Sequence, residues 1–186
     1  LTYVHNTIKH DGNHESPAGS NIIKWAEACK GGARGLHCGG LAHVLKDCYL
    51  SMGFKARHIS GLPKKYIGEC HSINVVYSNT LDKWIWVDPT NNAWVMDENG
   101  IMLSVQEVRE RLRDGRPVIL NEEAIWNNQQ KITKEYYLDS YMAKNLYSIK
   151  ADDVLLCPSD PNAENFFQAK YVVNDDAWFW QSPYQE

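Results

Sequence analysis

Residues 35–45 constrain this chain most, because they place a cysteine between glycines at the expected start of a helix. After Cys38, apolar residues recur at the three- and four-residue spacing of one helical face, namely Leu41, Val44, Leu45, Cys48, Tyr49 and Met52. Gly53 follows as a stop signal. Cys38 is therefore expected in the first turn, where free N–H groups and the helix dipole stabilise a thiolate. This setting favours a nucleophile, although a lone helix cysteine can also be an inert core residue.

The chain is long enough for one domain with a substantial core, at 186 residues and 44% hydrophobic composition. Its net charge of -4 does not indicate the excess of basic residues that is typical of proteins that bind nucleic acid. Its sequence has no apolar run of the roughly 18 residues that a membrane span requires. The chain begins at Leu1 rather than at methionine, so we expect that a longer precursor has been trimmed.

The cysteines indicate neither a disulfide framework nor a metal site. There are five of them, with no CxxC pair: Cys29, Cys38, Cys48, Cys70 and Cys157. Two His–Cys neighbours, at 37–38 and 70–71, raise the possibility of zinc, but adjacent residues of a helix or strand point apart. We therefore expect no metal and no other cofactor, with Cys29 and Cys48 in the core.

Periodicity and turn residues predict an α+β fold. A polar lead-in with little structure (1–19) precedes a helix over about 20–30, the cysteine helix and a strand over 54–60. Strands over 71–77 and 83–88 form a hairpin, and Ser104 caps a helix that ends near Arg113. A broken helical pattern covers 121–150, and strands are expected at 153–157 and 169–173 before an aromatic cluster at 178–180. We assign 20–120 to a catalytic core and 121–186 to an extension packed on it.

The hairpin can bring a histidine and an aspartate together. His71 opens one strand and Asp88 closes the other, so they lie opposite or diagonal on one face in two of the registers considered. Trp84 and Trp86 share that apolar face, against which we expect the Cys38 helix to pack. Asn74 points to the other face and is expected to make structural hydrogen bonds. The spacing permits a Cys38–His71–Asp88 triad.

Four blocks of sequence resemble the transglutaminase-like superfamily. They are Gly-Leu-His-Cys-Gly-Gly-Leu-Ala at 35–42, Gly-Phe-Lys-Ala-Arg at 53–57, His-Ser-Ile-Asn-Val-Val-Tyr at 71–77, and Trp-Val-Asp-Pro-Thr at 86–90. The resemblance covers about residues 20–92 and implies a papain-like fold, in which the nucleophile helix packs on an antiparallel sheet. It also implies Cys38 as nucleophile, His71 as general base and acid, and Asp88 as the orienting carboxylate. The remainder is similar in layout to bacterial extracytoplasmic members.

These features predict a cysteine enzyme that acts on amide bonds of a peptide or protein substrate, glycan-linked protein included. Hydrolysis by water is favoured over transfer to an amine, and a non-catalytic module that binds peptide or glycan is the alternative. The backbone N–H of Cys38 is one expected oxyanion donor. Asn21 and Trp25 are candidates for the second, with core packing favoured for Trp25. His43 lies off the apolar stripe and is expected to be solvated.

Overall fold

The computed structural model describes residues 1–65, 68–152, 170–172, 180 and 183. Its helical elements are α1 (Thr2–Thr7), α2 (Ile22–Cys29), η1 (Lys30–Gly32), α3 (Cys38–Ser51), α4 (Val105–Asp114), the π-helix η2 (Glu135–Met142) and α5 (Ala143–Asn145). Its strands are β1 (Ala56–Leu62), β2 (His71–Ser78), β3 (Lys83–Val87), β4 (Val95–Met96), β5 (Ile119–Leu120), β6 (Ile125–Trp126), β7 (Gln130–Lys131), β8 (Ser148–Asp152) and β9 (Lys170–Val172). The predicted α+β class is confirmed.

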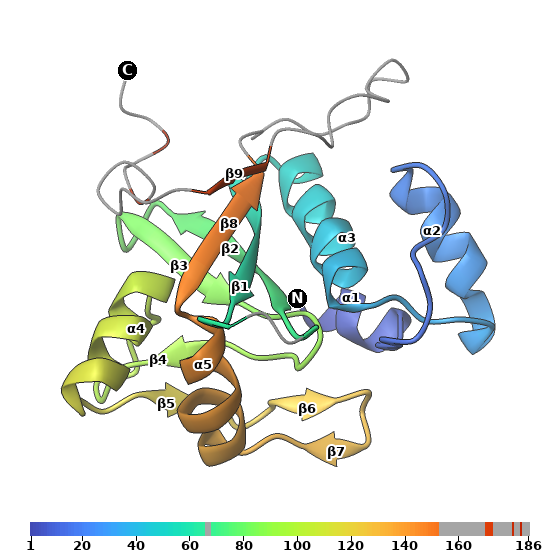
Figure 1. Cartoon of the computed structure of the whole chain (residues 1–186). Helices are drawn as coiled ribbons and strands as arrows, with labels where there is room; N and C mark the ends of the chain where they lie inside the picture. Colours follow the sequence, from blue (N-terminus) through green and yellow to red (C-terminus); the bar gives the residue numbers. More distant parts are fainter. Residues whose placement is uncertain (66–67, 153–169, 173–179, 181–182, 184–186) are drawn as a thin grey trace.

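A five-stranded antiparallel sheet, in the order β3-β2-β1-β8-β9, forms the centre of the fold. Figure 1 shows α3 along one face of this sheet, with α2 outside it, and α4 and α5 on the other side. The predicted hairpin of β2 and β3 is confirmed, whereas the strand expected over 54–60 begins two residues later, at Ala56. The strand expected at 153–157 lies outside the described residues, as do Cys157 and most of the 178–180 cluster.

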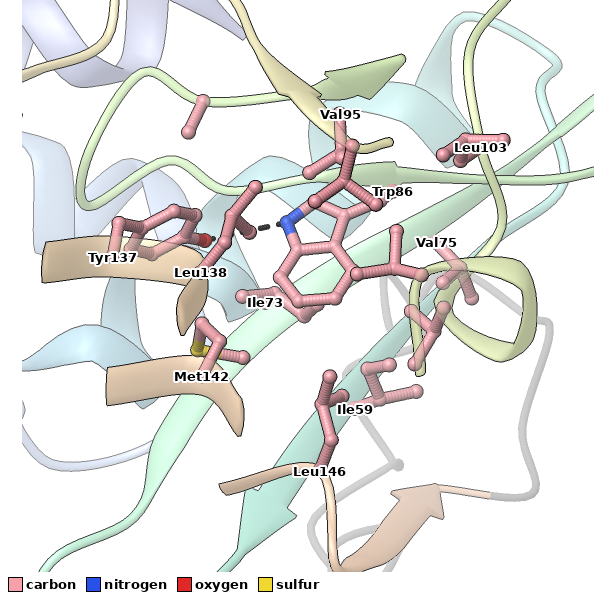
Figure 2. Packing of buried hydrophobic residues seen from close by; sticks show 14 of the residues in the cluster. Ile59, Ile73, Val75, Trp86, Val95, Leu103, Tyr137, Leu138, Met142 and Leu146 are labelled. Atoms are coloured by element: carbon pink, nitrogen blue, oxygen red, sulfur yellow. Dashed lines mark hydrogen bonds between the residues drawn. The ribbon is translucent and has the colours of Figure 1, made fainter. Parts of the chain in front are cut away.

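Alternation along β2 divides the core into two clusters, one on each face of the sheet. Ile73, Val75 and Tyr77 face a cluster that also contains Trp84 and Trp86. Figure 2 shows Trp86 within this cluster, with Tyr137, Leu138 and Met142 of η2 on one side of it. Ile59, Val95, Leu103, Tyr137, Leu138, Met142 and Leu146 also belong to it.

The second cluster corrects the expected position of the Cys38 helix. Leu41, Val44 and Leu45 of α3 pack with Val76 and Val87, on the opposite face from Trp84 and Trp86. Trp86 instead packs against Tyr137 of η2, and Trp84 packs against Tyr77 and the Arg57 guanidinium. The face nearer α3 also holds Asn74, whose amide donates to the Ala42 carbonyl (2.9 Å) and the Arg57 carbonyl (3.3 Å).

The first ten residues are ordered, contrary to the prediction of a lead-in with little structure. Thr2–Thr7 form α1, and the side chains of Val4 and Ile8 are buried in the same cluster as α3. The chain then passes beside the turn that leads into α3, because the amide of Leu36 donates to the Lys9 carbonyl (3.1 Å). The N-terminal segment is thus held next to the predicted nucleophile.

Candidate functional site

A histidine–aspartate pair lies buried at one end of the central hairpin. His71 is the first residue of β2, and Asp88 follows the last residue of β3. Asn74 pairs with Val87 across the two strands, so Asp88 is diagonal to His71, the second of the two predicted arrangements. The His71 Nε2 lies 2.7 Å from the Asp88 Oδ2, and the two residues are 2% and 0% exposed.

Four further donors hold the Asp88 carboxylate. The backbone N–H groups of Thr90 (2.8 Å) and Asn91 (3.4 Å) donate to Oδ1, while the Asn91 side chain (3.0 Å) and the Tyr137 hydroxyl (2.5 Å) donate to Oδ2. Burial opposes ionisation, but the charge of His71 and these hydrogen bonds outweigh it and lower the pKa of Asp88. The carboxylate is therefore a fixed negative charge beside the imidazole.

Tyr137 was not anticipated from the sequence, and it joins this pair to the hydrophobic core. Its hydroxyl accepts a hydrogen bond from the Trp86 indole (3.3 Å), drawn in Figure 2, while its own proton goes to Asp88. Burial, followed by the nearby Asp88 charge, raises the pKa of Tyr137 well above its ordinary value. The hydroxyl consequently stays protonated and remains a donor.

Cys38 begins α3, as predicted. Burial opposes ionisation of its thiol, but hydrogen bonding from the side chains of His10, His37 and His71, together with the charge of His71, lowers the pKa of Cys38 to about 3. Burial also disfavours the His71 imidazolium, but Asp88 and Cys38 raise the pKa of His71 to about 10. Between these values a thiolate and an imidazolium face each other.

The partner of each ring nitrogen defines the direction in which His71 moves protons. A carboxylate accepts hydrogen bonds, so Nε2 of His71 donates to Asp88. The other ring nitrogen, Nδ1, is left to exchange a proton with the Cys38 sulfur. The ring of Tyr141 covers this imidazole edge-on at 5.3 Å between centroids, and its hydroxyl donates to the Cys70 carbonyl (3.5 Å).

His37 and His10 are the two contacts of Cys38 that sequence reasoning missed. His37 caps α3, because its Nδ1 accepts the backbone N–H of Gly40 (3.2 Å), and its Nε2 lies 3.1 Å from the Ser16 hydroxyl. His10 reaches the sulfur from the N-terminal segment, and its Nδ1 accepts the Trp126 indole N–H (3.1 Å). An isolated histidine in a polar stretch carries no periodic signal, so only the folded chain identifies it.

The structure gives both candidates for the second oxyanion donor, Asn21 and Trp25, other contacts. Asn21 caps α2, where its side chain accepts the backbone N–H groups of Ile23 (3.0 Å) and Lys24 (3.2 Å). Trp25 is buried in the cluster around α3, where its ring lies 5.1 Å from that of His43. Trp25 therefore packs in the core, which is the interpretation that the sequence favoured.

His43 is buried, so the prediction of a solvated side chain was wrong. Only 3% of it is exposed, because α2 covers this side of α3 and Trp25 packs on the ring. Its Nε2 donates to the Ser20 carbonyl (3.2 Å) and lies 3.7 Å from the Asp47 carboxylate. Cys29, by contrast, is a core residue as predicted, and Cys48 packs against the same cluster.

No group of three or more metal-ligating side chains is found in the part of the chain that the structure describes. Over the same residues, no helix is both long and apolar enough to cross a membrane.

Comparisons with known proteins identify no relative of this chain. A scan against family models finds no match, and searches of curated proteins and of solved structures find none either. The interpretation of the site therefore depends on the residues and contacts described above.

Proposed function

We propose that this chain is a cysteine-dependent enzyme that acts on amide bonds through Cys38, His71 and Asp88. The observation that carries the proposal is the buried His71–Asp88 pair (2.7 Å), together with a cysteine at a helix start whose pKa His71 helps to lower. Burying a carboxylate and an imidazolium costs free energy. A module that only binds ligands has no need of that cost, which favours catalysis over the binding alternative.

The proposed reaction begins when the Cys38 thiolate attacks the carbonyl carbon of an amide. The C–N bond then breaks, the leaving amine takes the proton from His71 Nδ1, and a thioester remains on the sulfur. Water, deprotonated by His71, attacks the thioester; as the new C–O bond forms, the C–S bond breaks, which releases the acid and restores the Cys38 thiolate beside the His71 imidazolium. Transfer to an amine would follow the same path, and hydrolysis is favoured because water is always present.

The fold proposed for this chemistry is papain-like. Its support is that α3 starts with the nucleophile and packs on an antiparallel sheet whose second strand starts with the histidine. The order Cys38, His71, Asp88 along the chain matches the transglutaminase-like motifs in the sequence. A peptide or protein is the proposed substrate class.

The first test is the pH dependence of Cys38 alkylation by iodoacetamide, followed by mass spectrometry. The lowered pKa of Cys38 and the raised pKa of His71 predict rapid labelling of this cysteine already near pH 5. His71→Ala removes the imidazolium, so labelling should shift toward the pH of an ordinary thiol, near 8.5.

Cys48 serves as an internal reference in the same experiment, because burial and the charge of Asp47 raise its pKa. It should label slowly in both proteins. If Cys38 in the wild type labelled only above pH 8, the catalytic proposal would be lost and the binding module would take its place.

A further inference from the structure

We infer that His10 is a catalytic residue whose Nε2–H, together with the backbone N–H of Cys38, stabilises the oxyanion formed during acyl transfer. This inference rests on the proposed function. It gives the site the second donor that acyl-transfer chemistry calls for. It also gives a role to a histidine that lies 28 positions before the nucleophile, outside every sequence block that pointed to the triad.

The proton on His10 can be placed from its partners. The indole N–H of Trp126 only donates, so the His10 Nδ1 it contacts at 3.1 Å must be an acceptor. A neutral imidazole with an acceptor at Nδ1 carries its hydrogen on Nε2. Nε2 is then the nitrogen left to donate to Cys38, whose thiol pKa His10 lowers. Backbone hydrogen bonds on both sides of His10, from Leu36 N–H to the Lys9 carbonyl (3.1 Å) and from Asp11 N–H to the Leu36 carbonyl (2.8 Å), hold it beside the turn that leads into Cys38.

The same reasoning prevents His10 from acting as a second base. Its Nε2 already carries a hydrogen, and protonating Nδ1 would break the bond from Trp126. His71 has the reverse arrangement, with Nε2 donating to Asp88 and Nδ1 directed to the sulfur. His10 and His71 are thus a fixed donor and a proton carrier, whereas the two ring nitrogens of His37 are engaged by Gly40 and Ser16.

The backbone of His10 is held in place before any substrate binds. Its N–H donates to the Asn127 side-chain oxygen (2.6 Å), and the Asn127 amide donates back to the His10 carbonyl (3.0 Å). On the other side, the backbone N–H of Asp11 donates to the carbonyl of Leu36 (2.8 Å), which lies two residues before Cys38. A donor fixed in this way costs no reorganisation when charge develops, which is where such groups are most effective.

The position of His10 beside the sulfur suits the oxyanion. In the tetrahedral intermediate the oxygen is two bonds from Sγ, so a donor that contacts Sγ is within reach of it. The N–H of Cys38, in the first turn of α3, has no acceptor within its own helix and supplies the other hydrogen. His71 contacts the sulfur from β2 and serves the leaving group.

Two reagents separate an oxyanion donor from a residue that only supports the thiolate. When p-nitrophenyl acetate acylates Cys38, the S–C bond forms through a tetrahedral oxyanion, and the C–O bond breaks to release p-nitrophenolate. When iodoacetamide alkylates Cys38, the S–C bond forms as the C–I bond breaks, and iodide leaves without any oxyanion. Both rates are measured on the full chain at pH 7.

His10→Ala should slow acylation by about 10²- to 10³-fold and change alkylation by less than about threefold. His10→Gln, whose side-chain amide can still donate, should recover a large part of the acylation rate. His14→Ala is the matched control, since this exposed histidine of the same segment pairs with Asp11 and should leave both rates unchanged.

Equal slowing of acylation and alkylation in His10→Ala would overturn the inference, because His10 would then act on the thiolate alone. No change in either rate would overturn it as well. The proposed function fails in a different way: the wild type would be alkylated but would show no acylation burst. Unchanged alkylation in His10→Ala also shows that the site is still folded.

Discussion

Near Cys38, His71 and His10 differ in the partner of their far ring nitrogen. Nε2 of His71 donates to the Asp88 carboxylate, whereas Nδ1 of His10 accepts the Trp126 indole N–H. Because their outer partners differ, residues of the same type take different roles. The choice of Asp88 and Trp126 as partners therefore matters as much as the histidines themselves.

Tyr137 is the residue whose removal tests how Asp88 is held. Tyr137→Phe deletes the donor at 2.5 Å from Asp88 and leaves the buried Trp86 N–H without its acceptor. We expect the free energy of unfolding to fall by about 1–3 kcal/mol, as measured by urea denaturation. Alkylation of Cys38 should also begin at higher pH, because a less stabilised carboxylate supports the imidazolium less well.

Tyr136→Phe is the control for this change, since Tyr136 is adjacent in η2 but 58% exposed. It should alter neither stability nor alkylation by a measurable amount. Equal stability of the two variants would show that the hydroxyl of Tyr137 contributes nothing to the pair.

At the scale of elements, the segment before α3 has to approach the N-terminal segment closely. A Cβ at Gly35 would lie 2.6 Å from the Lys9 carbonyl oxygen and 2.6 Å from the Asp11 Cβ. Only glycine allows residues 9–11 to lie this near the start of α3. Glycine is thus required at position 35 for steric reasons, which the surrounding sequence did not reveal.

Gly35→Ala should therefore displace His10 without touching the triad. We expect acylation by p-nitrophenyl acetate to fall by at least tenfold, with alkylation of Cys38 nearly unchanged. Ser104→Ala is the comparison, because it removes the capping box of α4 and costs about 1 kcal/mol far from the site. If Ser104→Ala reduced acylation as much as Gly35→Ala, general destabilisation would explain both.

The elements with a regular pattern could be predicted, and those built by distant contacts could not. Helix α3, the β2–β3 hairpin and the Ser104 cap each have a local signal in spacing or turn residues. The short helix α1 has none, since its order comes from burying Val4 and Ile8 against α3. His10 was missed for the same reason, as Trp126 lies 116 residues away.

The helical pattern predicted over 121–150 is confirmed only in its second half. Helical structure covers η2 and α5, whereas β6 and β7 precede them. Leu138, Met142 and Leu146 lie in the core. Because η2 is a π-helix, hydrogen bonds from i to i+5 change the spacing of its faces, so counting by 3.6 does not separate the exposed Tyr136 from the buried Tyr137. Periodicity therefore finds this segment but not the residue that donates to Asp88.

Over the whole molecule, the candidate site is assembled from segments that span residues 10–141. His10, Cys38, His71, Asp88 and Tyr137 come from five separate parts of the chain and meet at one end of the sheet. The division of the chain at residue 120 stays a prediction. Residues on both sides of it nevertheless pack in the cluster around Trp86.

The ion pair also predicts how global stability varies with pH. The pKa of Cys38 falls from 9.0 to about 3 on folding, so this group makes stability rise with pH between those values. The pKa of His71 rises from 6.5 to about 10, so its stabilisation is complete below 6.5 and is lost as the pH rises to about 10. From pH 6.5 to 9 the two effects oppose each other.

Cys38→Ser leaves only the second effect, so the variant should lose stability steadily above pH 6.5 while the wild type stays nearly level to about pH 9. Urea denaturation under reducing conditions at pH 5, 7 and 9 measures the difference, which should grow with pH. Profiles that run parallel would mean that the thiol does not ionise at unusually low pH in the folded protein.

The contact between His10 and Trp126 has a consequence for how the protein is made. The ribosome synthesises Cys38, His71 and Asp88 well before Trp126 and Tyr137. The side chains of these two later residues contact His10 and Asp88. During that interval the thiol has the reactivity of any cysteine in an unfinished chain. Under the proposed function, catalysis would therefore begin only after residue 137 has been synthesised.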